Sequence, residues 1–155
     1  MPMIESAEQF VRLRTSDDAA DQRRATHDEA AITVWTDVIR RFPAMRSWVA
    51  HNKTVPSEIL ETLASDDDAR VRGAVAMRRA TPALVLEALA QDPDEGVRLR
   101  VARNSRAPRA ALLRLADDPW NEARRVATER LGADGDAGSQ GSEGEVRPER
   151  AQSFE

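Results

Sequence analysis

Residues 89–104 read LAQDPDEGVRLRVARN. The acidic segment in the middle interrupts an apolar stretch, and Val97 and Val101 then recur at the four-residue spacing of one helical face. Asp92 is suited to cap this second helix, with Glu95 as its capping-box partner. The stretch therefore predicts two short helices joined by a tight turn.

The same pattern recurs every 26 residues on both sides of this stretch. The recurring positions are Pro56, Pro82 and Pro108; Leu60, Leu86 and Leu112; Leu63, Leu89 and Leu115; and Asp66, Asp92 and Asp118. Helices of about two to three turns are unstable alone, so each must bury its apolar stripe against its neighbours. We therefore predict tandem two-helix units; a compact bundle with accidental periodicity is the alternative.

Each unit also carries signals for where its helices begin and end. Thr81 precedes Pro82, so we expect Thr81 to cap the first helix and Pro82 to occupy its first position. Asn104 is suited to end the second helix. A fourth copy aligns through Arg46, and it is shorter where its two helices join.

The repeated pattern L-A-x-D-x-D-x-x-V-R-x-x-V-A-x-N-x-x-x-P resembles the leucine-rich repeat variant family, a short relative of HEAT-type α-solenoids. The resemblance covers roughly residues 38–131 and implies an all-α fold: a short right-handed α-solenoid of about four two-helix repeats. It implies a helical scaffold and leaves activity unspecified. Some members of that family carry an iron–sulfur cluster, a property that does not carry over because this chain has no cysteine.

The two ends of the chain lack the period. Residues 1–37 are predicted to form an N-terminal helical cap over the exposed end of the repeats, although this segment could instead be a partner-binding surface. Residues 132–155 are rich in glycine and acidic side chains and are predicted to be disordered. The repeats at 38–131 lie between these two segments.

Composition excludes several classes of function. With no cysteine, disulfides, thiolate metal sites and cysteine nucleophiles are absent. No signal peptide or membrane-spanning run is present, and we expect a cytoplasmic protein. Residues 46–131 carry 15 basic and 13 acidic side chains, without the strong basic excess of a typical nucleic-acid binder. No motif predicts a catalytic, metal or cofactor site.

One arginine recurs per unit beside the recurring aspartates. These arginines are Arg46, Arg72, Arg98 and Arg124, and the aspartates are Asp66, Asp92 and Asp118. The planar guanidinium fork suits bidentate pairing with a carboxylate. We expect an Arg–Asp ladder in which each arginine pairs with the aspartate of its own or of the adjacent unit; the alternative is an arginine column that grips phosphates or an acidic peptide.

The tryptophans and His51 differ in their expected roles. Trp35 lies on an apolar stripe and is predicted to be in the core. Trp48 breaks the repeat and is expected to pack beneath the N-terminal cap. Trp120 occupies a position that should be exposed, so it either anchors a partner or covers the end of the repeats. His51 is expected at the surface.

Arrays of short helices offer a continuous surface, so the favoured function is a non-enzymatic scaffold that binds another protein. The candidate contact residues are Trp120, Arg100 and Arg103. The alternative is a nucleic-acid-binding module that uses an arginine-rich edge. Its candidate residues are Arg78, Arg79, Arg103 and Arg106. An enzyme or enzyme subunit is a third hypothesis, for which the sequence offers no site.

Overall fold

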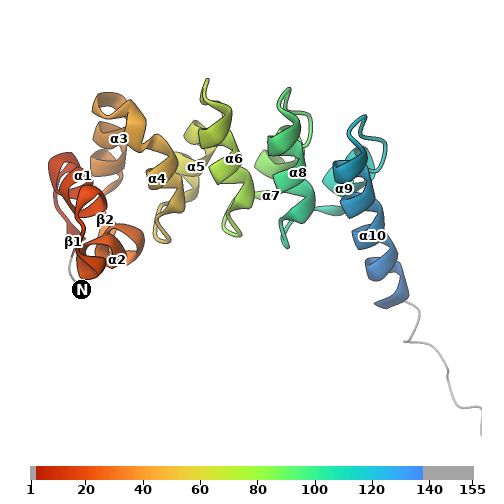
Figure 1. The fold of residues 1–155 in the computed structure, drawn as a ribbon, viewed down its shortest axis with the longest axis horizontal. Helices are drawn as coiled ribbons and strands as arrows, with labels where there is room; N and C mark the ends of the chain where they lie inside the picture. The colour runs from red at the N-terminus through yellow and green to blue at the C-terminus, as the bar shows by residue number, and fades with distance from the viewer. Residues whose placement is uncertain (1–2, 138–155) are drawn as a thin grey trace, which may run out of the picture.

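The computed structural model of this chain describes residues 3–137 (Figure 1). These residues form ten α-helices, one 3₁₀ helix and two very short strands, so the prediction of an all-α fold is confirmed. The elements are β1 (Met3–Ile4), α1 (Ala7–Thr15), α2 (Ala19–His27), β2 (Glu29–Ala30), α3 (Ile32–Arg41), η1 (Pro43–Met45), α4 (Arg46–His51), α5 (Ser57–Leu63), α6 (Ala69–Met77), α7 (Ala83–Leu89), α8 (Glu95–Arg103), α9 (Arg109–Leu115) and α10 (Asn121–Ala137).

The helices from α3 onward lie in two rows. Helices α4, α6, α8 and α10 each contact the next member of their row, and Figure 1 shows them side by side along the long axis of the molecule. The odd-numbered helices lie behind them, and α5, α7 and α9 each contact the helix that follows in the chain. We call the surface made by α4, α6, α8 and α10 the even-helix face.

The periodic aliphatic side chains form the core between these rows. All six recurring leucines are buried: Leu60, Leu63, Leu86, Leu89, Leu112 and Leu115. Val97 and Val101 are fully buried on α8, as are Ala123 and Ala127 on α10. The leucines that share the 26-residue spacing therefore point away from water, as the repeat interpretation requires.

Two helix starts differ from the prediction. Asp92 is not the cap of α8: Asp94 is, and its Oδ1 accepts a hydrogen bond from the Val97 N–H at 3.0 Å. The Asp92 carboxylate is instead occupied by Arg72. Thr81 is not a cap either, because its hydroxyl donates to the Val75 carbonyl at 2.7 Å and α7 begins at Ala83.

The N-terminal segment packs around an aromatic pair. Trp35 of α3 is fully buried, as predicted, and its ring meets Phe10 of α1 edge to face, with the centroids 5.3 Å apart. The parallel pairing of β1 with β2 was not expected; it fastens the start of the chain beside the segment before α3. The expected domain boundary after residue 37 falls inside α3, which runs to Arg41.

The C-terminal helix is longer than predicted. We expected disorder from residue 132, but α10 continues through Ala137. A glycine such as Gly132 costs a helix about 1 kcal/mol relative to alanine, which does not stop a helix already nucleated and packed upstream. Residues 138–155 of the predicted disordered tail lie outside the described residues. Among residues 3–137, no helix is both long and apolar enough to cross a bilayer.

Candidate functional site

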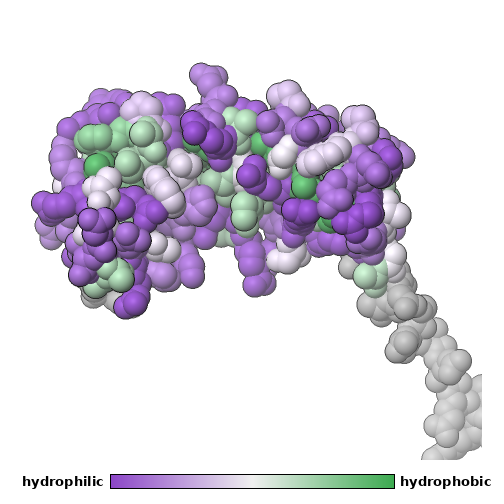
Figure 2. Space-filling view, viewed as in Figure 1, coloured by the Kyte–Doolittle hydropathy of each residue, from purple (hydrophilic) through white to green (hydrophobic). Residues whose placement is uncertain are grey.

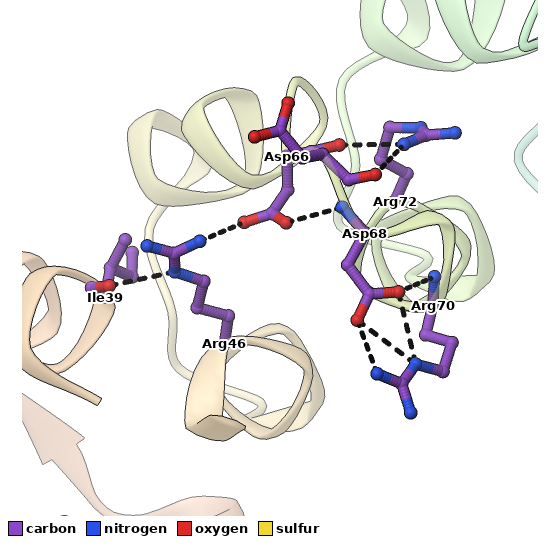
Figure 3. A network of polar contacts seen from close by, with 7 residues as sticks. Ile39, Arg46, Asp66, Asp68, Arg70 and Arg72 are labelled. Carbon is purple, nitrogen blue, oxygen red and sulfur yellow. Dashed lines mark hydrogen bonds and ion pairs between the residues drawn. The ribbon is translucent and has the colours of Figure 1, made fainter. Parts of the chain in front are cut away.

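The recurring arginines and aspartates are paired in the structure. Arg72 donates from Nε and Nη2 to the two carboxylate oxygens of Asp92 at 2.7 and 2.9 Å. Arg98 makes the same two-pronged contact with Asp118 at 2.7 and 3.2 Å. Arg46 donates once to Asp66, at 3.2 Å (Figure 3). In each case the partners are 20 residues apart, so the contact connects one helix pair to the next.

Each arginine also binds a backbone carbonyl in its own unit. Arg72 donates from Nη1 to the Asp66 carbonyl at 2.8 Å, as Figure 3 shows, and Arg98 donates likewise to the Asp92 carbonyl. Arg124 makes this carbonyl contact with Asp118, and no carboxylate in residues 3–133 lies within 4.0 Å of its guanidinium. The guanidinium groups of Arg72 and Arg98 are thus fully engaged in hydrogen bonds within the protein. They are not free to bind phosphates.

The pairing changes the pKa of the buried carboxylates. Burial alone would raise the pKa of Asp92, but the hydrogen bonds from Arg72 and from the Asp94 N–H hold it below its ordinary value of 3.8. The pKa of Asp118 is lowered in the same way by Arg98 and the Trp120 N–H, again against the effect of burial.

These lowered pKa values predict acid sensitivity. A carboxyl whose pKa is depressed by folding contributes stability that is complete above the unfolded pKa and is lost as pH falls through the folded pKa. We expect the urea midpoint to fall between about pH 5 and pH 2, and to fall less in Asp92→Asn, in which one of these groups no longer titrates. If the urea midpoint fell equally steeply with pH in the wild type and in Asp92→Asn, the lowered pKa of Asp92 would not be a source of the acid sensitivity.

A second set of side chains at the 26-residue spacing binds backbone carbonyls at helix ends. The Asn52 amide nitrogen donates to the carbonyls of Ala25 and Asp28 at 2.9 and 3.0 Å. Asn104, which ends α8 as predicted, donates to the carbonyls of Ala76 and Arg78 at 2.7 and 2.9 Å.

Arg130 completes this carbonyl-binding set on α10, with bonds to the carbonyls of Ala102 and Asn104. Arg78 stands at the same spacing but differs. Its Nε is buried and has no hydrogen-bond partner among the described residues. This carbonyl-binding set was not predicted from the sequence. Asn52 and Asn104 stand two repeat lengths apart, and that spacing could have indicated it.

Two adjoining hollows lie on the even-helix face. The first, which we call the Trp48 hollow, has a volume of about 370 Å³, and its lining includes Arg14, Trp48, His51, Lys53, Met77 and Arg78. The second, the Arg100 hollow, has a volume of about 340 Å³ and is lined by Met77, Arg100, Arg103 and Asn104. Met77 borders both hollows, so the two form one interrupted groove across α4, α6 and α8.

Trp48 is more exposed than predicted. We expected it beneath the N-terminal cap, but 39% of its surface is accessible. From the cap, Arg14 of α1 approaches this ring: its guanidinium lies 3.5 Å from the Trp48 ring centroid in a cation–π contact. His51, exposed as expected, lies beside the same ring at 5.5 Å between centroids.

Arg100 reaches across the face because α6 has a glycine opposite it. A Cβ added to Gly73 would lie 2.6 Å from the Arg100 Nη1, so only glycine leaves room for this placement of the guanidinium. Arg103 donates to Glu122 at 3.0 Å. The structure thus brings Arg100 and Arg103, two of the predicted partner-binding residues, to one hollow with Met77.

The other predicted residues lie elsewhere. Trp120, the third candidate contact, is half-buried before α10 and does not line the Arg100 hollow. Of the nucleic-acid set, Arg79 and Arg106 are exposed in the loops after α6 and α8, and Arg78 is half-buried in the Trp48 hollow. These cations do not form one continuous free surface, because Arg103 between them is ion-paired.

A groove of about 800 Å³ lies between α5 and α7, in the other row of helices. Leu84 and Val85 contribute apolar surface, and the charged residues of its lining are Glu61, Asp66, Asp67, Arg72 and Asp92. Since Arg72 and Asp92 are bound to each other, this groove reflects the packing of the ladder.

Among the residues described, no group of three or more histidine or acidic side chains is placed to hold a metal ion. Comparison with known proteins finds no matching family model, no matching curated protein and no matching solved structure.

Proposed function

We propose that this protein is a non-enzymatic scaffold that binds a partner protein on its even-helix face. The observation that carries the proposal is the groove across α4, α6 and α8, where Trp48 and Met77 are exposed between cationic side chains. Exposed aromatic and methionine side chains are enriched where proteins bind one another. Figure 2 shows apolar surface on this side of the molecule, interrupted by hydrophilic side chains.

We propose further that the helix pairs form a short right-handed α-solenoid of about four repeats, α3/α4 through α9/α10, resembling the leucine-rich repeat variant family. The 26-residue spacing of the buried leucines and the Arg72–Asp92 and Arg98–Asp118 pairs support this arrangement. In such an array the units enlarge one surface continuously, which suits the binding of an extended partner segment.

A protein partner accounts for the groove better than a nucleic acid. A nucleic-acid site depends on cations that are free to neutralise phosphates. Here Arg103 is paired with Glu122, and Glu122 is also bound by Arg125. Carboxylates on the same face would repel a phosphate backbone but are compatible with a mixed protein surface.

Site-specific photo-crosslinking tests the proposal. We expect the photoreactive residue benzoylphenylalanine at Met77, which is 60% exposed, to form a covalent adduct with a partner in cells that contain it. Leu113 of α9, 51% exposed in the other row, is the matched control and should form no such adduct. The measurement is a mass-spectrometric comparison of the two samples. Adducts from Leu113 alone, or none from either position, would count against the proposal.

A further inference from the structure

Two side chains that differ from their counterparts at the 26-residue spacing line one hollow. Arg78 stands at the spacing of Asn52, Asn104 and Arg130, whose side chains bind backbone carbonyls, and Trp48 stands where Ala74 and Arg100 stand. Arg78 differs from the other three in having no side-chain hydrogen bond to a described residue, and Trp48 is the aromatic residue at its spacing. Both line the Trp48 hollow, which points to a role in binding.

The Arg78 side chain has no hydrogen-bond or ion-pair partner among the described residues. The asparagines at its spacing bind two carbonyls each, whereas no hydrogen bond joins the Arg78 side chain to any described residue, and its Nε is buried. Burial lowers the pKa of the Arg78 guanidinium, yet arginine remains charged in proteins. A buried N–H without an acceptor is costly, and a bound anion would remove that cost.

The residues around Arg78 favour a negatively charged ligand. Arg14, Lys53 and Arg78 all line the hollow, and no aspartate or glutamate does. Lys53 is the only lysine in the chain. Trp48 and Met77 supply apolar walls next to these cations. A volume of about 370 Å³ is small, near the lower end of ordinary ligand pockets, and suits one or two side chains.

We infer that the Trp48 hollow anchors an acidic segment of the partner protein, with an aspartate or glutamate carboxylate bound at Arg78 and an adjacent apolar side chain against Trp48 and Met77. The inference rests on the proposed function and adds the chemistry of the partner. Bidentate carboxylate recognition is the geometry that a guanidinium offers. Arg14 and Lys53 supply further positive charge for neighbouring acidic residues.

The decisive variant is Arg78→Asn. It restores the residue found at positions 52 and 104, so the new amide can bind the carbonyls of Ala50 and Asn52 as Asn104 binds those of Ala76 and Arg78. We therefore expect the variant to fold with an unchanged or higher melting temperature. The matched control is Arg79→Asn, which removes an exposed cation beside the hollow without removing a lining residue.

The experiment is a selection of random displayed peptides on the full chain, followed by fluorescence polarisation with the enriched peptides. We expect them to carry aspartate or glutamate next to an aromatic or aliphatic residue. Arg78→Asn should weaken their binding by about tenfold or more, as the loss of a charge-assisted hydrogen bond implies, and Arg79→Asn should weaken it much less. A glutamine version of each peptide should lose affinity for the wild type and not for Arg78→Asn.

Three outcomes would overturn the inference: enrichment of peptides without acidic residues, equal affinity of wild type and Arg78→Asn, or displacement of the peptides by a thymidine oligonucleotide that binds more tightly at the same ionic strength. If Met77 still crosslinks a partner while the peptides show no carboxylate dependence, the inference fails and the proposed function stands. If the acidic peptides bind through Arg78 but no partner is crosslinked from Met77, the proposed function fails instead.

Discussion

Replacing Arg72 with alanine is expected to lower the free energy of unfolding by about 3–5 kcal/mol, the usual cost of removing one partner from a buried ion pair. The Asp92 carboxylate is buried, and Arg72 supplies two of its hydrogen bonds. Without Arg72 only the Asp94 N–H would remain, so a charge would be left in the interior with little compensation. Urea unfolding followed by circular dichroism measures the loss.

The control for this variant is Arg70→Ala on the same helix. Arg70 also pairs with an aspartate, Asp68, at 2.8 Å, but 88% of its side chain is exposed. Exposed pairs contribute little because water and salt screen them, so Arg70→Ala should barely move the unfolding midpoint. Similar losses in the two variants would show that the Arg72–Asp92 pair does not connect the helix pairs. The double variant Arg72→Ala/Asp92→Ala should recover part of the loss, because it leaves no uncompensated charge.

The ladder illustrates what periodicity alone can predict. Arg72 and Asp92 each recur with the same 26-residue spacing, so the sequence predicts pairing between these two kinds of residue. The sequence left open whether each arginine would pair within its own unit or with the adjacent one, and it assigned Asp92 both to the ladder and to the cap of the following helix. Two capping arrangements fit the same sequence. Asp92 could cap the helix with Glu95 three residues later, or Asp94 could cap it with the Val97 N–H three residues later, as the structure shows. Only the contact with Arg72, 20 residues away, decides between these two registers.

The candidate site depends on parts of the chain that lack the period. Trp48 is visibly a departure from the repeat, but its exposure depends on how α1 lies against α4. Arg14 lies in the N-terminal segment before the repeats, so the repeat pattern could not place it over that ring. Arg78 was only partly recoverable: the 26-residue spacing aligns it with Asn52, Asn104 and Arg130, but its lack of a hydrogen-bond partner is visible only in the structure.

Leu89→Ala is the second change with a large expected effect. Leu89 of α7 is 3% exposed, and emptying a buried leucine site costs about 2–5 kcal/mol. α7 has only seven residues, too few to be a stable helix alone, so its stability comes from the side chains that it buries against neighbouring helices. The loss should appear in the urea midpoint and in the thermal midpoint.

Leu84→Ala provides the matched comparison, because it makes the same substitution in the same short helix at a side chain that is 78% exposed. The two variants have the same intrinsic helix propensity, so the difference between them isolates the contribution of burial. We expect Leu84→Ala to change the free energy of unfolding by no more than about 0.5 kcal/mol. If both variants lost stability equally, α7 would be held by its own sequence, and the argument that these helices depend on neighbouring pairs would be wrong.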